Sequence, residues 1–456
     1  MIEKFFGTGG VKVKVDILII GGVAAGTSAG AAAKRRDNSL DILLVQKEKY
    51  ISYGGCGLPY YVEGIIDTID KVMEFTPEKF KEKKGVDVMS LHEVYKVDFD
   101  RKVAKIRSLE SGEKFEVEYG KLIISTGASA IVPKIEGVED DRIFTIRNPE
   151  DAMKIRSFIE EKKPERAVIV GGGYIGVEMA EAIASHGVKV TIVEALGNLL
   201  TNAEPEINEV ILEGLKKNGV EVLLNTTVQK LIPEERVKVV TTNGEIDADF
   251  VLMAVGVKPN TEIFNLEKGI KGAIKVDSLG KTSAQDVYAA GDCATAKHII
   301  TGKDVYIPLG TTANKQGRVA GRVAAGGIDR FAGVVGASVT KIFDVEFARA
   351  GLTKNEAIKE GFDAEAIYIK SRSRAGYYPG AGPVHIKLVF DKKTGRILGA
   401  QVAGKEVHRR LDVIVAAIYG RLTVMDLGYM DLSYAPPFSP VWDPILIAGN
   451  VARRKI

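Results

Sequence analysis

The chain has 456 residues, with 63 Lys and Arg against 60 Asp and Glu and a formal net charge of +3. This length predicts two to four domains, and the balanced, evenly spread charge argues against a nucleic-acid-binding protein. The two cysteines lie far apart, so we expect neither a disulfide scaffold nor a metal site. No run of about 20 apolar residues occurs, so we expect a cytoplasmic protein with no membrane segment.

A strand, turn and helix unit begins at Asp16 with DILIIGGVAAGTSAGAAAKRR, after a short extension of unknown purpose. Gly21 and Gly26 supply the first and third glycines of the dinucleotide fingerprint, while Val23 stands at the second. Gln46 ends the next strand, where a carboxylate usually binds the ribose hydroxyls. An amide can still accept a hydroxyl hydrogen bond, so the pattern predicts a weakened dinucleotide site.

Residues 51–61, ISYGGCGLPYY, surround Cys56 with three glycines. Pro59 can open a helix at its first position, which places Cys56 just before a helix N-terminus. The free N–H groups there favour an anion, so we expect the thiol pKa to fall below about 8.5. The alternative interpretation is a buried structural cysteine.

The following segment predicts a helix near residues 76–83 and a small antiparallel meander over 94–103 and 114–118. Residues 121–126 form a further buried strand, which Gly127 ends.

A second unit begins at Ala167 with AVIVGGGYIGVEMAEAIASHGVKVTIVEA. Gly171, Gly173 and Gly176 complete the fingerprint, with a strand before them and a helix after. In this context the pattern strongly indicates a dinucleotide site, because the helix N-terminus and the glycine turn together accept a pyrophosphate.

Glu194 ends the next strand of this unit. A carboxylate at this position accepts hydrogen bonds from both ribose hydroxyls of NAD and repels the 2′-phosphate of NADP. Residues 195–202 contain no Arg or Lys that could offset the repulsion. We therefore expect NADH to be preferred, with NADPH as the other donor.

Residues 220–224, 228–231 and 237–242 predict a second meander with an Asn-Gly turn at its end, and 249–256 predict a strand that ends in glycine. In TSAQDVYAAGDCA, a short strand delivers Asp292, which could otherwise serve as a helix cap; we expect Cys293 to be a small buried residue.

PLGTTANKQGRVAG, residues 308–321, leads into a helix of small residues. The chain changes character from about Phe331, where no glycine fingerprint occurs and an α+β domain is expected. Its tail, LSYAPPFSPVWDPI, predicts a packing strap or an arm over another surface. The elements expected in this domain are strands over 339–343, 366–371, 385–390 and 397–402 and a helix over 407–419.

From Asp16 to the C-terminus the chain resembles the FAD and pyridine-nucleotide-disulfide oxidoreductases. Its motifs IIGGVAAGTSAGAAAKRR, SYGGCGLPYY, GGGYIGVEMAE, DVYAAGDCA, YYPGA and YAPPFSPVWDP are similar to those of the single-cysteine branch. That branch holds CoA-disulfide reductases, NAD(P)H polysulfide or persulfide reductases, and NADH oxidases and peroxidases. The resemblance implies an α/β fold with two Rossmann-like domains and a C-terminal α+β dimerisation domain. The expected boundaries are 1–121 and 254–328 for the FAD domain, 122–253 for the NAD(P)H domain and 329–456 for the dimerisation domain.

The resemblance also implies FAD in the first unit and NADH in the second. Asp292 would then bind the ribitol chain of FAD, Val94 would meet the adenine, and Tyr174 would gate the nicotinamide pocket. The full set expected to bind FAD is Gly21, Gly22, Ala25, Gly26, Gln46, Lys47, Val94, Thr126, Gly127, Asp292 and Thr312. The set expected to bind the nicotinamide nucleotide is Gly171, Gly173, Tyr174, Gly176, Glu194 and Gly256.

In this family Cys56 would relay electrons from the flavin to a sulfur substrate. All five histidines lie outside the tail motif, so we expect no histidine base there. The resemblance assigns the proton-handling role to Tyr378 and Tyr434, contributed across a homodimer. Tyr377 could replace Tyr378, and each of these residues could instead be an interface-packing aromatic.

Aligned with the family's oxidases and peroxidases, Ala24 occupies the position of their histidine, so sulfur chemistry is favoured over oxygen chemistry. Coenzyme A would be a substrate or bound ligand, held by Arg35 among the basic residues of the first helix and by Ser52; the alternative is a solvated basic helix end. We expect a CoA-disulfide, CoA-persulfide or polysulfide reductase. The alternatives are an NADH oxidase or peroxidase that uses a cysteine sulfenic acid, and a flavin-containing binding protein.

Overall fold

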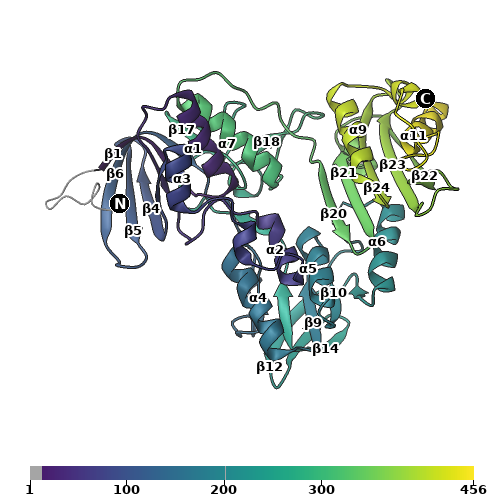
Figure 1. Ribbon diagram of the computed structural model, residues 1–456, viewed down its shortest axis with the longest axis horizontal. Coiled ribbons are helices and arrows are strands. Elements are labelled where there is room, and N and C mark those ends of the chain that lie inside the picture. The colour runs from purple at the N-terminus through teal and green to yellow at the C-terminus, as the bar shows by residue number, and fades with distance from the viewer. Residues whose placement is uncertain (1–12, 201) are drawn as a thin grey trace.

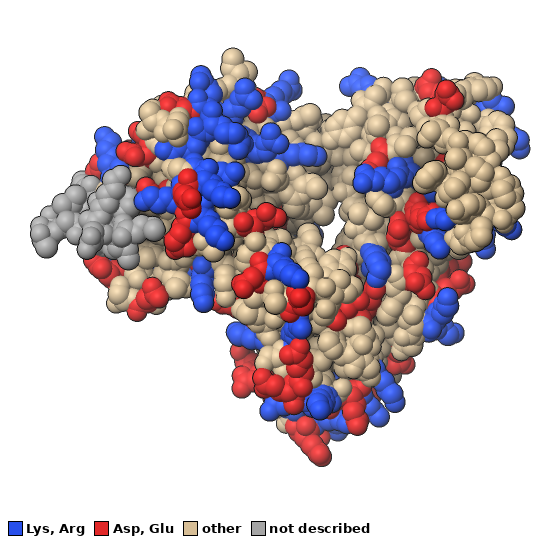
Figure 2. Space-filling model, viewed as in Figure 1, with Lys and Arg blue, Asp and Glu red and all other residues tan. Residues whose placement is uncertain are grey.

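The computed structural model describes residues 13–200 and 202–456, which form three lobes (Figure 1). In the view of Figure 1 the first lobe lies at upper left, the nucleotide lobe at the bottom and the C-terminal lobe at upper right. Figure 2 shows a deep notch between the two upper lobes. The three-lobed α/β architecture with a C-terminal α+β domain confirms the expected fold class.

The sheet of the first lobe has the strand order β3-β2-β1-β6-β5-β4, with β17 beside β6. Buried and more exposed residues alternate in β4 and β5 and at the start of β1. The second half of β1 and all of β2 are buried, as expected for parallel strands that helices cover on both faces. These strands are β1 (Val13–Ile20), β2 (Ile42–Val45), β3 (Asp87–Met89), β4 (His92–Asp98), β5 (Val103–Ser108), β6 (Lys114–Ile124) and β17 (Val287–Ala289).

Strand β6 corrects the prediction of two separate strands in this region. It continues through Gly120, where a Cβ would lie 2.8 Å from the Asp16 carbonyl oxygen, so a residue without a side chain lets the strand pass close to β1. The expected domain boundary at residue 121 falls inside this strand. Strand β1 begins at Val13, so part of the expected extension belongs to the sheet, and residues 1–12 lie outside the described residues.

Helices α1 (Ala24–Arg36) and α7 (Gly310–Ala324) pack together on this sheet, and α3 (Pro77–Lys84) is capped by Thr76. The close contact requires glycine: a Cβ at Gly317 would lie 2.2 Å from the Ala25 carbonyl oxygen. The predicted small-residue helix after residue 308 is therefore confirmed.

The nucleotide lobe contains a parallel sheet of order β11-β10-β9-β15-β8. Residues 220–224 were expected in a meander, and this is wrong: β11 pairs in parallel with β10. The meander consists of β12, β13 and β14, and the predicted Asn243-Gly244 turn joins β13 to β14. The elements are β8 (Ile143–Phe144), α4 (Pro149–Lys162), β9 (Arg166–Val170), α5 (Tyr174–Ala184), β10 (Lys189–Val193), α6 (Pro205–Lys217), β11 (Glu221–Leu223), β12 (Val228–Pro233), β13 (Val237–Thr241), β14 (Gly244–Ala248) and β15 (Phe250–Met253). Two short strand pairs lie outside both large sheets: β7 (Ala128–Ala130) with β16 (Val257–Pro259), and β18 (Ala296–Lys297) with β19 (Asp304–Val305).

The C-terminal lobe is an antiparallel sheet of order β20-β21-β24-β23-β22 with helices on it, as expected for an α+β domain. The prediction missed β21 and three of the helices. The elements are β20 (Ser338–Ile342), β21 (Val345–Gly351), α8 (Lys354–Lys359), β22 (Ala364–Arg372), β23 (Pro383–Asp391), β24 (Ile397–Gly404), α9 (His408–Tyr419), α10 (Val424–Tyr429) and α11 (Pro444–Ala452).

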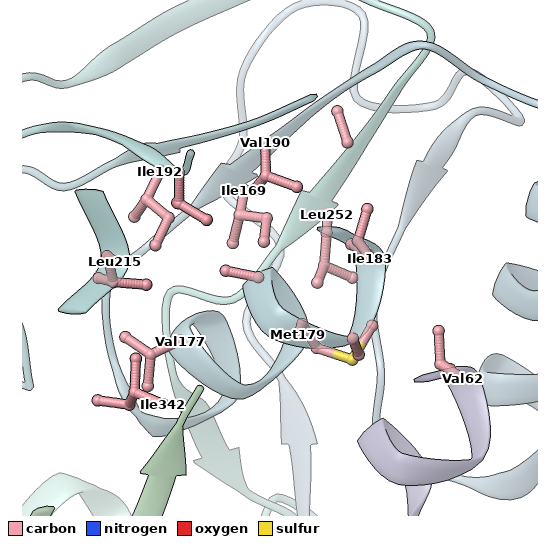
Figure 3. Packing of buried hydrophobic residues seen from close by; sticks show 14 of the residues in the cluster. Val62, Ile169, Val177, Met179, Ile183, Val190, Ile192, Leu215, Leu252 and Ile342 are labelled. Carbon is pink, nitrogen blue, oxygen red and sulfur yellow. The ribbon is translucent and has the colours of Figure 1, made fainter. Parts of the chain in front are cut away.

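One hydrophobic core joins all three lobes. It is centred on α5 and the sheet below it, and it takes in Val62 of α2 (Leu58–Glu63) on one side and Ile342 of β20 on the other (Figure 3). Both side chains are fully buried. The helix that follows Cys56 is thus anchored in the nucleotide lobe.

Within residues 13–200 and 202–456, no helix combines the length and the apolar composition that crossing a membrane requires.

Candidate active site

A cavity of about 710 Å³ lies beside the first glycine turn, within the usual size of ligand sites. Cys56 lies on its wall together with Ala24. Most residues expected to bind FAD also line it: Gly21, Gly22, Ala25, Gln46, Lys47, Val94, Thr126, Gly127 and Asp292. Two others do not. Gly26 supports the turn from behind, since its Cβ would lie 1.8 Å from the Gly21 carbonyl oxygen, and Thr312 is buried in α7.

In both glycine turns a backbone N–H donates a hydrogen bond to a side chain at the end of the following strand. In the first, the Gly22 N–H donates to the Gln46 Oε1 over 2.8 Å. In the second, the Gly172 N–H donates to the Glu194 Oε2 over 2.6 Å, and the other carboxylate oxygen accepts the Leu196 N–H at 2.7 Å. Gln46 and Glu194 are therefore structural equivalents that differ in charge.

The second turn leaves space where a pyrophosphate would bind. Gly171 has φ +106°, and a Cβ there would lie 2.5 Å from the Ala254 carbonyl oxygen. A Cβ on Gly176 would lie 2.0 Å from the Gly171 carbonyl oxygen, whereas nothing lies within 4 Å of one on Gly173. These are the turn, packing and approach roles of the three fingerprint glycines. Gly256 follows β15 near the same edge of the sheet.

Asp292 does not stand free in the cavity, because Arg147 pairs with it. The Arg147 Nη2 lies 2.7 Å from the Asp292 Oδ2, and the Arg147 Nε donates to the Ala128 carbonyl oxygen at 2.8 Å. The pair supports the position expected to face the ribitol chain. Sequence reasoning missed Arg147, which lies just before α4 and has no local motif to mark it.

Sequence reasoning also missed several other polar residues of the cavity wall, among them Glu48, Tyr53 and Asn148. Glu48 accepts a hydrogen bond from the Tyr53 hydroxyl at 3.1 Å and another from the Asn148 Nδ2 at 3.0 Å. Asn148 also caps α4, accepting the Asp151 N–H. Glu48 lies three residues after the end of β2, close to the position where a dinucleotide site usually has a carboxylate and this chain has Gln46. This proximity is the one sequence signal that points to Glu48.

The Cys56 thiol has a different electrostatic environment from the one expected. It lies in a short turn, Gly55–Gly57, ahead of α2, and its side chain reaches the cavity surface. Burial by the surrounding protein raises its pKa, and the nearby carboxylates of Glu178 and Asp292 raise it further. The expectation of a lowered pKa is therefore wrong, because desolvation and the two carboxylates outweigh the Arg147 guanidinium and the backbone hydrogen bond, both of which lower the Cys56 pKa.

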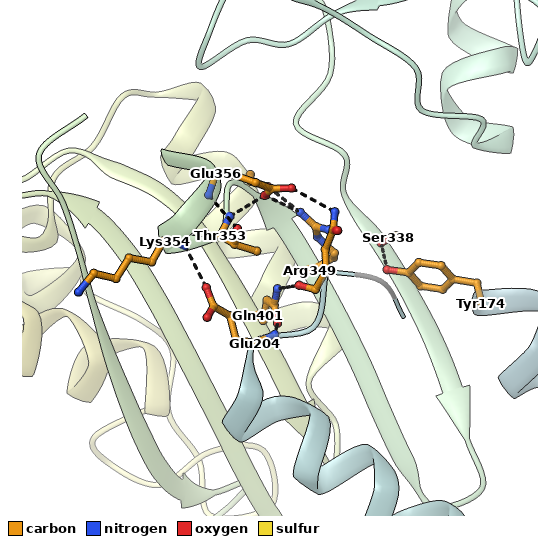
Figure 4. Close-up of polar contacts among 10 residues, drawn as sticks. Tyr174, Glu204, Ser338, Arg349, Thr353, Lys354, Glu356 and Gln401 are labelled. Atoms are coloured by element: carbon orange, nitrogen blue, oxygen red, sulfur yellow. Dashed lines mark hydrogen bonds and ion pairs between the residues drawn. The ribbon is translucent and has the colours of Figure 1, made fainter. Parts of the chain in front are cut away.

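Tyr174, the first residue of α5, is not among the residues that line this cavity. Its hydroxyl lies 2.7 Å from the Ser338 Oγ of β20 (Figure 4). Its ring lies against that of Phe347. One turn further along the helix, Glu178 accepts a hydrogen bond from the Thr340 hydroxyl at 2.8 Å. Cys293 is fully buried, as expected.

The tail tyrosines lie on the C-terminal lobe, and none of them lines the cavity of its own chain. The Tyr434 hydroxyl is 3.3 Å from the Tyr377 hydroxyl, whereas the Tyr378 ring faces the Arg374 guanidinium at 5.8 Å. Hydrogen bonding to Tyr377 raises the pKa of Tyr434. The structure thus brings Tyr377, and not Tyr378, to Tyr434.

The two residues expected to bind coenzyme A lie outside the cavity wall. Arg35 is exposed in the last turn of α1. Lys and Arg side chains gather on this lobe around α1 and α7 (Figure 2). Ser52 has φ +49°, and its N–H donates to the Gly22 carbonyl oxygen at 2.9 Å. Its backbone thus ties the cysteine loop to the first glycine turn.

The Cys56 environment generates a test. In a Cys293→Ala background, Glu178→Gln removes a negative charge near the thiol, so the Cys56 pKa falls and iodoacetamide alkylation at pH 7.5 becomes about threefold faster. The alkylation rate of the parent rises with pH until the pH exceeds the raised pKa. Glu181→Gln, one turn further from the thiol, is the control and leaves the profile in place. An unchanged profile for Glu178→Gln would contradict this assignment.

Comparison with known proteins shows the family to which the chain belongs. The family described as pyridine nucleotide-disulphide oxidoreductase matches residues 15–317, and the dimerisation domain of that family matches residues 337–444. The NAD(P)H coenzyme A polysulfide/persulfide reductase of Pyrococcus horikoshii is 41% identical over 97% of this chain and 100% of its own. The coenzyme A disulfide reductase of Staphylococcus epidermidis is 30% identical over 96% of this chain and 99% of its own.

A solved structure agrees in shape. The NAD-dependent persulfide reductase from A. fulgidus superposes with a TM-score of 0.93 at 37% identity, over 96% of this chain and 83% of that one. The matched family uses FAD and NAD(P)H, which confirms the expected cofactors. The glycine cradle beside Gly21 and the cavity that runs from it to Cys56 fit a bound flavin dinucleotide. The chain belongs to the pyridine nucleotide-disulphide oxidoreductases, as its motifs indicated.

Proposed function

We propose that this protein uses NADH to reduce a CoA disulfide, CoA persulfide or polysulfide through Cys56. The observation that carries the proposal is the position of Cys56, which is exposed on the wall of the same cavity as the Gly21 turn and Thr126. Ala24 lines the cavity at the position where an imidazole would support peroxide chemistry. The curated relatives that act on CoA sulfur compounds support the same substrate class.

The chemistry follows from the thiol. The Cys56 thiolate attacks one sulfur of a CoA disulfide, the S–S bond breaks, a Cys56–CoA mixed disulfide forms, and the first CoA leaves as a thiolate that takes up a proton. When bound, the flavin supplies the two electrons that originate from NADH. Two-electron reduction of the mixed disulfide would return Cys56 to the thiolate and release the second CoA as a thiolate.

A homodimer would complete this site. The dimerisation-domain match supports it, as does a set of large apolar side chains that the tail region exposes. We propose that the Tyr377–Tyr434 pair of one subunit faces Cys56 of the other and supplies the proton to the leaving thiolate. The exposed large hydrophobic residues of the tail are Tyr434, Phe438, Val441 and Trp442, and Tyr429 is exposed at the end of α10 just before it.

We also assign the anionic end of coenzyme A to the basic end of α1, with Arg35 as the cation and Ser52 beside the pantetheine arm. The exposure of Arg35 and the basic side chains around α1 support this assignment. Two free cysteines fit a reducing, cytoplasmic setting, which we propose as the location.

The relay is tested by half-reactions. Protein reduced anaerobically with NADH should be reoxidised rapidly by CoA disulfide or polysulfide, followed by flavin absorbance. Cys56→Ser should lose at least about a hundredfold in this rate, because a hydroxyl cannot form the mixed disulfide. Cys293→Ala is the matched control and keeps the parent rate. Equal reoxidation of Cys56→Ser by every sulfur acceptor would refute the relay, and faster reoxidation by peroxide than by sulfur would favour a peroxidase.

The nucleotide preference is tested separately. We expect kcat/KM for NADH to exceed that for NADPH by at least about tenfold, because the Glu194 carboxylate repels the 2′-phosphate. Glu194→Gln should narrow the ratio, while its amide oxygen keeps the Gly172 N–H bond, as the Gln46 amide does for Gly22. An NADPH efficiency equal to or above that for NADH in the parent would contradict the assignment.

The tyrosine pair gives a third test. Tyr377→Phe and Tyr434→Phe should each slow reoxidation by CoA disulfide about tenfold or more and leave flavin reduction by NADH unchanged, because they act on the leaving thiol. Tyr378→Phe is the matched neighbour and should behave as the parent. A loss confined to Tyr378→Phe would assign the role to that residue instead.

A further inference from the structure

Helix α5 and strand β20 make a continuous set of polar contacts between the nucleotide lobe and the C-terminal lobe. Along one face of the helix, Tyr174 contacts Ser338, and Glu178 accepts from Thr340. Further along, Glu181 accepts the Phe343 N–H at 2.7 Å. Ile342 of β20 lies fully buried between these contacts, against the same helix. Ser338 is therefore fixed relative to the first turn of α5.

A second contact between the two lobes makes this arrangement rigid. The buried Gln401 of β24 accepts the Glu204 N–H at 2.7 Å and donates to the Asn202 carbonyl oxygen at 2.5 Å (Figure 4). The Lys354 N–H donates to the Glu204 carboxylate at 2.9 Å. Together with the α5 contacts, these bonds hold the C-terminal lobe against the nucleotide lobe at two separate points. A side chain at the second glycine turn can therefore move more easily than either lobe.

Tyr174 is the side chain best placed for such a movement. It begins α5 directly after Gly173, at the turn where the nucleotide binds. Its ring is turned to β20, packs on Phe347 with ring centroids 6.3 Å apart, and does not line the cavity that holds Cys56. In this position the phenol is partly buried and needs a hydrogen-bond partner, which the Ser338 hydroxyl supplies.

We propose that Ser338 is a positioning residue for nucleotide binding: its hydroxyl holds the Tyr174 ring against β20 and so keeps the nicotinamide end of the groove open. To cover the groove, the ring must give up both this hydrogen bond and its contact with Phe347. Without the Ser338 hydroxyl, the ring occupies the groove more often and competes with the nicotinamide. The inference rests on the proposed use of NADH.

The test measures binding by the flavin-loaded enzyme with two ligands. Tetrahydro-NAD keeps the shape of the nucleotide and cannot donate hydride, and ADP-ribose lacks the ring that would meet Tyr174. By titration calorimetry, Ser338→Ala should bind tetrahydro-NAD about fivefold more weakly than the parent, the effect of one hydrogen bond on the open state. Its affinity for ADP-ribose should not change.

Further variants separate positioning from simple loosening. Ser338→Thr keeps a hydroxyl and should restore the affinity. Tyr174→Phe removes the same hydrogen bond from the helix side, and the double variant should be no weaker than either single variant. Lys341→Met loosens the same interface at the Glu181 ion pair and should bind both ligands as the parent does.

Equal affinities of Ser338→Ala and the parent for tetrahydro-NAD would overturn the proposal, as would an equal loss for both ligands. If Ser338→Ala does not fold, Tyr174→Phe is measured instead. An unchanged affinity for tetrahydro-NAD, or an equal loss for both ligands, would then overturn the proposal in the same way. A parent enzyme that neither binds tetrahydro-NAD nor is reduced by NADH would overturn the proposed function itself, which distinguishes the two failures.

Discussion

The packing of α5 between α2 and β20 is the constraint on which the rest of the molecule depends. The N-terminal turn of this helix is where we propose that the nucleotide binds. Val62 of α2 anchors the cysteine loop to this helix, and Ile342 of β20 anchors the C-terminal lobe to it. Val62 and Ile342 are fully buried, so neither can shift without opening the core. The donor site and the thiol are thereby held in one frame, although they are far apart in the sequence.

The polar groups of the site are arranged around that frame. Arg147 neutralises Asp292 at the edge of the cavity, whereas Glu178 and the bulk of the surrounding protein keep the Cys56 thiol protonated more often than a free cysteine. A thiol of raised pKa is a stronger nucleophile once it is deprotonated, but a poorer leaving group. The carboxylates near Cys56 therefore lower the fraction of thiolate that can attack a sulfur substrate, and they also disfavour spontaneous release of Cys56 from the proposed mixed disulfide. In the proposed cycle, electron delivery is thus the step that frees the enzyme.

Much of this could be predicted from local sequence patterns, and the failures have a common cause. The glycine turns, the cysteine loop and the α1–α7 helices have short-range signatures, and the structure has each of them. Arg147 and Glu48 reach the cavity through tertiary packing, so no spacing marks them. The predicted direction of the Cys56 pKa was wrong because a helix-end argument counts only neighbours in sequence, whereas the desolvation and the Glu178 carboxylate that raise this pKa come from tertiary packing.

The errors in the sheets are of the same kind. An apolar stretch such as residues 220–224 suits a meander or a parallel sheet equally well, and only its partner strand decides between them. The choice between Tyr377 and Tyr378 likewise depended on the fold of the tail, which sets Tyr434 beside the first. In each case the sequence predicted the residue types and the local element, but not which distant strand or side chain would contact them.

The anchoring of α2 in the nucleotide lobe has a consequence for how this architecture can be taken apart. The cysteine loop belongs by chain connectivity to the flavin lobe, yet the floor beneath it is built from residues more than 100 positions later. An exchange of the nucleotide lobe for that of another protein would therefore replace the support of the reactive thiol along with the donor site. The choice of donor and the geometry of the thiol therefore depend on the same lobe, which could not be exchanged without changing both.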